Sequence, residues 1–159
     1  MNKRRMLMIG VFVALLAAML VTVPVLAANR NFVTHMSGDE EVPAVDTLAQ
    51  GQAIFHLSKD GETLEYKLIA ANIENVLASH IHLAPSGVNG PIVAFLYVGP
   101  IPGRFDGVLA RGTITAANLV GPLAGQPLSA LIAAMEAGNT YVNVHTTQYP
   151  GGEIRGQIK

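Results

Sequence analysis

The most regular alternation of hydrophobic and polar residues lies between Gln52 and Leu68, on both sides of a short turn. Apolar side chains occupy every second position before and after that turn: Ala53, Phe55 and Leu57, then Leu64, Tyr66 and Leu68. A period of two is typical of a strand with one buried face. The intervening Asp60-Gly61 pair favours a tight turn. The pattern therefore predicts an antiparallel β-hairpin.

Short apolar runs continue along the chain, separated by glycine, proline and asparagine. They predict further strands at 32–36, 77–83, 92–98, 108–115, 141–146 and 153–158. The run at 92–98 is almost continuously apolar, so we expect a strand buried on both faces. A turn is predicted at 72–76, and the Gly-Pro-Ile-Pro-Gly segment at 99–103 is expected to exclude regular structure.

One segment has the period of a helix instead. Its apolar residues recur at intervals of three and four: Leu128, Leu131, Ile132 and Met135. Pro127 suits a helix start, and Gly138 suits the position just after a helix end. We therefore expect a short helix at about 127–137. Many short strands with one inserted helix predict an all-β fold, an antiparallel Greek-key β-sandwich.

The N-terminus differs from the rest of the chain. A basic stretch, Lys3 to Arg5, precedes a long apolar run, and small or modest residues end it at 25–27. This is the pattern of a secretory signal peptide, predicted at 1–27, with the domain at 28–159. The alternative is an uncleaved N-terminal anchor, and only that alternative makes the membrane a partner. In both cases we expect export, to the outside or to the cell envelope.

Charge and cysteine content narrow the function classes. Three of the ten lysines and arginines lie in the predicted leader, so the remaining domain has more acidic than basic residues. It has no basic patch, and nucleic acid is therefore not expected as a partner. The chain has no cysteine, which excludes disulfides, thiolate nucleophiles and cysteine-ligated metal sites.

Three histidines are the main candidates for chemistry. His80 and His82 lie two residues apart on a predicted strand, so their side chains should share a face. His145 lies on a later predicted strand, together with Tyr141 and Asn143. If the two faces meet, three imidazoles could bind copper or zinc. The alternative is that these histidines brace loops by donating N–H bonds to carbonyls. His35 and His56 are separate, and we expect them to be partly exposed.

Glu41 and Arg155 are candidates for an ion pair. Glu41 ends an acidic cluster that is most simply a solvated turn, and one member could pair with Arg155 or Arg111 or contribute to a calcium site. For Arg155 we favour a surface or cross-strand ion pair over a guanidinium that faces an anion near the histidines. No serine-nucleophile elbow, glycosidase carboxylate pair or phosphate-binding glycine loop is evident, so we predict no catalytic residue.

Four stretches together resemble the CHRD domain, named after chordin. They are Ser37-Gly38 with Glu41-Val42-Pro43, His80-Ile81-His82 with Gly87-Val88-Asn89-Gly90-Pro91, Gly138 to Thr146, and Pro150 to Ile158. The resemblance spans about 31–159, with the motifs in family order. Ala44 stands where the family often has a second proline. The resemblance implies a secreted all-β domain without an established enzymatic activity.

A fainter likeness is to the copper,zinc superoxide dismutases. It consists of a His-x-His strand, a later Val-His strand and an arginine near a glycine-rich C-terminal strand. The additional ligand histidine, the aspartate loop and the cysteine pair of those enzymes have no counterpart here.

We therefore expect a secreted, non-enzymatic CHRD-type binding or structural module, whose partner is an extracellular protein or a cell-envelope component. The alternative is a copper- or zinc-binding protein that could be redox-active.

Overall fold

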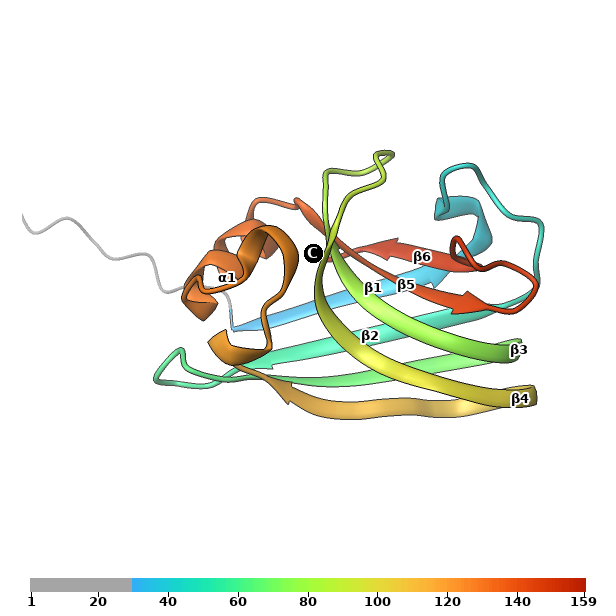
Figure 1. The fold of residues 1–159 in the computed structure, drawn as a ribbon, viewed down its shortest axis with the longest axis horizontal. Coiled ribbons are helices and arrows are strands. Elements are labelled where there is room, and N and C mark those ends of the chain that lie inside the picture. Colours follow the sequence, from blue (N-terminus) through green and yellow to red (C-terminus); the bar gives the residue numbers. More distant parts are fainter. Residues whose placement is uncertain (1–29) are drawn as a thin grey trace, which may run out of the picture.

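The computed structural model describes residues 30–159, so the predicted leader at 1–27 lies outside the described residues. Six strands and one α-helix make up most of this range (Figure 1). The elements are β1 (Asn31–Ser37), η1 (Gly38–Glu40), β2 (Gln50–Leu57), β3 (Leu64–Leu83), β4 (Ile92–Ile114), η2 (Ala116–Asn118), η3 (Gly121–Leu123), α1 (Leu128–Glu136), β5 (Thr140–Thr146) and β6 (Ile154–Gln157). Within these residues, no helix has the length and apolarity needed to cross a bilayer.

The strands form one antiparallel sheet that closes on itself. Its order is β2-β1-β6-β5-β3-β4, and β2 pairs with β3 as well. Five strands thus close a barrel. The sixth, β4, pairs with the other edge of β3 and is not part of the closed ring. The predicted all-β class is confirmed, but the pairing describes a barrel where we expected a Greek-key sandwich. The cause is the length of β3, whose first half pairs with β2 and whose second half pairs with β5.

Two long strands replace four short ones. The predicted turn at 72–76 lies inside β3, and the Gly-Pro-Ile-Pro-Gly segment lies inside β4, so both predictions are wrong. Asn72 and Asn75 adopt positive φ angles of 54° and 53°, a conformation that asparagine tolerates better than most residues. The register between β3 and β4 shifts around both asparagines. These bulges bend the ladder without ending it.

The bulges also change which residues of β3 face the barrel core. The core residues are Leu68 and Ala70 before the first bulge, Ile73 and then Val76 around the second, and Ile81 after a third register shift between Val76 and Ala78. A shift of one residue turns every following side chain to the opposite face. His80 and His82 therefore point to the outer face of the barrel instead of into its core.

The strand at 92–98 is not buried on both faces. Phe95 is 50% exposed and Val98 is 72% exposed, whereas Val93 and Leu96 are buried. This segment belongs to β4, the edge strand of the sheet, which pairs with β3. Its apolar run predicted the strand, but the sheet leaves one of its faces uncovered.

The hairpin and the helix agree with their predictions. Ala53, Phe55, Leu57, Leu64 and Leu68 are buried, and Tyr66 is partly buried. In α1 the four apolar residues at helical spacing are all buried. Gly138, with φ at 68°, follows the helix end. Its N–H donates to the carbonyl of Met135 and that of Asn139 donates to Ala134, which is a Schellman cap.

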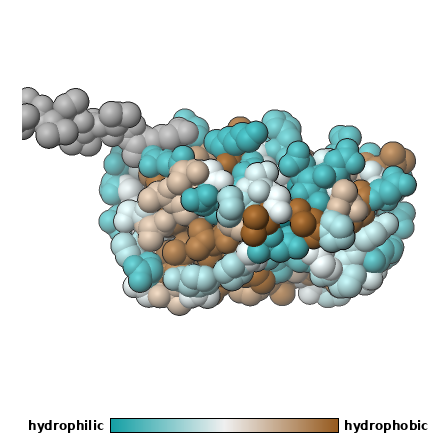
Figure 2. Space-filling model, turned by 90° about the horizontal axis from the view of Figure 1, so that it is seen from above, coloured by the Kyte–Doolittle hydropathy of each residue, from teal (hydrophilic) through white to brown (hydrophobic). Residues whose placement is uncertain are grey.

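The helix lies at one end of the barrel, beside η2 and η3 (Figure 1). The face of the molecule in Figure 2 is largely hydrophilic, with hydrophobic residues gathered towards the α1 end.

Closure of the barrel depends on a close approach of β6 to β1. A Cβ atom at Gly156 would collide with the carbonyl oxygen of His35 and the hydroxyl of Thr34. We expect Gly156→Ala to lower the free energy of unfolding by about 1–3 kcal/mol, as for other overpacked sites. Urea unfolding measures this.

Gly151→Ala is the matched control, because a Cβ there meets no atom within 4 Å. Its effect should stay within about 0.5 kcal/mol. Equal effects of the two substitutions would contradict the close approach.

Candidate metal centre on the outer face of the barrel

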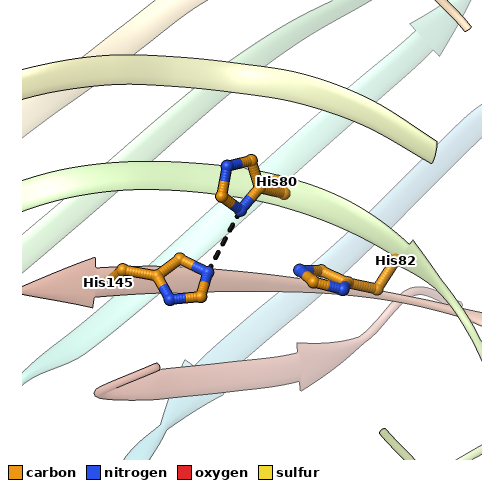
Figure 3. A group of neighbouring side chains, drawn as sticks. All are labelled: His80, His82 and His145. Atoms are coloured by element: carbon orange, nitrogen blue, oxygen red, sulfur yellow. Dashed lines mark hydrogen bonds between the residues drawn. The ribbon is translucent and has the colours of Figure 1, made fainter. Parts of the chain in front are cut away.

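The three histidines come together from two neighbouring strands (Figure 3). In the ladder between β3 and β5, His80 lies opposite Asn143 and His82 lies opposite Tyr141, while His145 lies opposite Ala78. One nitrogen of each imidazole lies within 4.8 Å of the others. His80 Nδ1 and His145 Nε2 are 3.1 Å apart. The alternation of each strand placed these side chains on one face, and the pairing of the two strands brings the faces together.

Backbone carbonyls orient two of the three rings. His82 Nδ1–H donates to the carbonyl of Gly90 at 2.8 Å, and His145 Nδ1–H donates to that of Pro150 at 2.9 Å. These are the loop-bracing bonds that the sequence predicted as an alternative to metal binding. They also set the tautomer, because an Nδ1 that carries the proton leaves Nε2 with a free lone pair. Bracing and metal binding therefore use different nitrogens of the same rings.

Burial keeps all three imidazoles neutral. His80 and His82 are 7% and 8% exposed, and the edge of Phe95 packs against His80. Desolvation, with smaller contributions from neighbouring His145 and His82, lowers the pKa of His80 from 6.5 to about 4. Desolvation also lowers the pKa of His82 and of His145. Neutral imidazole is the form that binds metal.

Arg155 is buried beside this cluster, so the expected surface ion pair is wrong. It is 2% exposed, and its guanidinium carbon lies 3.4 Å from the centroid of the Tyr141 ring. The ring of His82 stacks on Tyr141 with centroids 4.7 Å apart. Arg155 forms no ion pair within 4.0 Å among the described residues, where Arg104–Asp106 is the salt bridge. The strand alternation placed Arg155 on the histidine face, but the loops that bury it could not be seen in the sequence.

Arg155 connects β6 to the loop that follows β3. Its guanidinium donates to the carbonyl of Val88 at 2.8 Å and to Asn89 Oδ1 at 3.0 Å. Asn89 Nδ2 in turn donates to the carbonyl of Val42. The loop so held contains Gly90, whose carbonyl orients His82. Arg155 is thus a positioning residue for the histidine cluster, and no anion is needed to explain it.

Glu41 is buried next to the cluster instead of solvated. It is 7% exposed, whereas Asp39 and Glu40 are exposed as predicted. Desolvation raises the pKa of Glu41 to about 7, although the charge of Arg155 acts in the opposite direction. Arg111, the other expected partner, is exposed. His35 and His56 lie apart from the site and are exposed, as expected.

Sequence reasoning did not assign a role to Asn143. It lies on β5 between Tyr141 and His145, and it is 3% exposed. Its amide oxygen is buried and has no hydrogen-bond partner. The signal was available, because strand alternation places Asn143 on the same face as His145.

The comparisons with known proteins agree with this fold and these motifs. The sequence model of the CHRD domain matches residues 32–158. The chain belongs to the CHRD domain family. CHRD domains are typically extracellular modules. No curated protein and no solved structure matches this chain.

Two groups of this site oppose each other as the pH changes. The lowered pKa of His80 makes the metal-free protein more stable as pH rises from 4 towards 6.5, because the unfolded chain binds the extra proton there. His82 and His145 act in the same direction. The raised pKa of Glu41 makes the protein less stable as pH rises from 4.5 to 7.

Glu41→Gln removes the opposing contribution. When the pH rises from 4.5 to 6.5, the free energy of unfolding should increase by about 2 kcal/mol more in this variant than in the wild type. Urea unfolding at several pH values, with a chelator present, measures the two profiles. Parallel profiles would show that Glu41 does not hold a proton in the folded state.

Proposed function

We propose that this CHRD domain is an extracellular metal-binding module with one mononuclear copper or zinc site. The ligands are His80 Nδ1, His82 Nε2 and His145 Nε2. The observation that carries the proposal is the convergence of three neutral imidazoles, one nitrogen of each within 4.8 Å of the others. Three imidazoles are a ligand set that both metals accept.

The spacing is close to that of a bound ion. Bonds of about 2.0–2.1 Å at tetrahedral angles place two ligand nitrogens about 3.3–3.4 Å apart. His80 Nδ1 and His145 Nε2 are 3.1 Å apart, so small rotations of the side chains would complete the site. Carbonyl acceptors on the second nitrogen of a ligand histidine are usual in metal sites, and Gly90 and Pro150 supply them.

A metal-free cluster is the second candidate. In it, His80 Nδ1–H donates to His145 Nε2, and the histidines serve only to hold the loops. This arrangement gives the rings of His80 and His145 a hydrogen bond to each other, but it leaves His82 Nε2 buried without a hydrogen-bond partner. A buried acceptor without a partner is unfavourable by about 1–3 kcal/mol. Metal binding would use all three nitrogens, and we therefore favour it.

The module works outside the cell in this proposal, as a non-enzymatic domain whose partner is an extracellular protein or an envelope component. Support comes from the leader-like pattern at 1–27 and from the extracellular character of the family. The absence of cysteine suits an exported domain stabilised by its core and by an ion.

Metal titration of the purified domain tests the site. We expect the wild type to bind about one Cu²⁺ or Zn²⁺, and His145→Ala to weaken binding by more than about 100-fold. Loss of an outer-shell partner alone weakens binding by about 10–100-fold, and a lost ligand should have a larger effect. Isothermal titration against a competing chelator measures this.

His56→Ala is the matched control, because His56 is an exposed histidine of β2 that bonds to Asn31 of β1 and is not part of the cluster. It should bind as the wild type does. The proposal fails if the wild type takes up no stoichiometric metal, or if both variants bind equally.

The N-terminus of the exported protein tests the location. When the full chain is expressed in a secreting host, we expect the extracellular fraction to begin at Ala28, because the cleavage pattern ends at Ala27. Intact-mass spectrometry reads this directly. A membrane-bound protein that retains residues 1–27 would support the anchor instead.

A further inference from the structure

Three buried acceptors beside the histidines lack a hydrogen-bond donor. They are His82 Nε2, Asn143 Oδ1 and Glu41 Oε1. Buried polar atoms are nearly always paired, so several without partners in one region require an explanation. His82 Nε2 and Asn143 Oδ1 offer a lone pair and no proton, since the proton of His82 is used at Gly90. What fits between them must be a Lewis acid or a hydrogen-bond donor.

The orientation of the Asn143 amide is set by its surroundings. A Cβ atom added at Gly152 would contact both Glu41 Oε1 and Asn143 Nδ2. The carboxyl group of Glu41 therefore lies on the side of the Asn143 amide that carries the N–H₂ group. The amide oxygen therefore points away from Glu41, and Asn143 shares its strand face with the ligand His145. Two acceptors, an imidazole nitrogen and an amide oxygen, are left without a donor between them.

We propose that the metal of this site keeps a fourth position for an exchangeable water molecule, and that Asn143 Oδ1 accepts a hydrogen bond from that water. This inference rests on the proposed function. In this arrangement the metal would be coordinated by His82 Nε2, and the water at the fourth position would donate a hydrogen bond to the amide oxygen of Asn143. Three protein ligands with an open fourth position are the arrangement of reactive zinc centres, whereas structural centres are closed by four.

A groove lies on the Glu41 side of the site. It has a volume of about 250 Å³ and adjoins Glu41, between the segment 42–45 and the loop 148–152. That loop carries Pro150, whose carbonyl orients His145. In this proposal the water at the fourth position exchanges with solvent on the side of this groove, and small ligands can replace it.

The class of ligand follows from the acceptors. Asn143 Oδ1, an acceptor without a proton, favours a molecule with an O–H group and disfavours an anion. Asn143 is thus a positioning residue that selects water over anions at the fourth position. Its removal should leave the metal in place and make the position more accessible to an anion.

The first test measures the longitudinal relaxation of solvent water protons with the Cu²⁺-loaded domain. We expect faster relaxation than with Cu²⁺ in a chelate that leaves no position for water. Relaxation equal to that of such a closed chelate, with one Cu²⁺ bound, would overturn the inference and leave the proposed function intact. Failure to bind Cu²⁺ or Zn²⁺ would overturn both.

The second test measures azide affinity of the Cu²⁺-loaded protein by optical titration. Asn143→Ala should raise azide affinity about 5- to 10-fold, the equivalent of one hydrogen bond to water. Asn143→Asp keeps the shape and the acceptor and adds charge, so it should lower azide affinity by at least a similar factor. The two variants thus move in opposite directions, and the second retains the buried volume.

Gln148→Ala is the control, since Gln148 is an exposed residue of the same groove. It should leave azide affinity unchanged. If Asn143→Ala and Asn143→Asp both match Gln148→Ala, Asn143 does not act at the fourth position, and the assignment is wrong.

Discussion

The structure depends on the continuous pairing of β3 with strands on both sides along its twenty residues. Its first half pairs with β2 and its second half with β5, so β3 closes the barrel. Irregularities at Asn72, at Asn75 and between Val76 and Ala78 make this possible, because they bend the strand and together leave its inward face shifted by one residue. The same shift turns His80 and His82 outward, towards the face of β5 that bears His145. Barrel closure and assembly of the histidine cluster are therefore one structural event.

The outer face of the barrel carries a second, polar layer that loops bury. Arg155 links that layer to the loops through Val88 and Asn89 and stacks on Tyr141. Carbonyls of Gly90 and Pro150 then orient His82 and His145. A polar network in low dielectric is stable only when its members have partners. The unpaired acceptors at His82, Asn143 and Glu41 are exceptions, and in our proposals a metal ion and its water supply the partner for two of them.

Local patterns predicted the elements whose residues interact mainly with their neighbours in sequence. The hairpin up to Leu68 followed from alternation and from Asp60-Gly61, and α1 followed from apolar spacing and Gly138. Predictions failed where pairing with a distant strand overrode local preference. Asparagine, glycine and proline usually end a strand, yet β3 and β4 continue through them because each supports the other's ladder across the bulges. Arg155 was expected at the surface because the pattern of a four-residue strand does not reveal which loops cover it.

The sequence by itself determined the all-β class, the family, the short helix and the three histidines as the candidate ligands. Periodicity, turn chemistry and motif order are properties of the sequence itself, so they can be interpreted without knowledge of long-range contacts. Only the tertiary structure decided that the sheet closes into a barrel, that His80 and His82 lie on its outside, and that Arg155, Glu41 and Asn143 are buried beside them. These outcomes depend on strand register and on loops far apart in sequence. A shift of one residue in β3 reverses a whole face, and no local pattern records it.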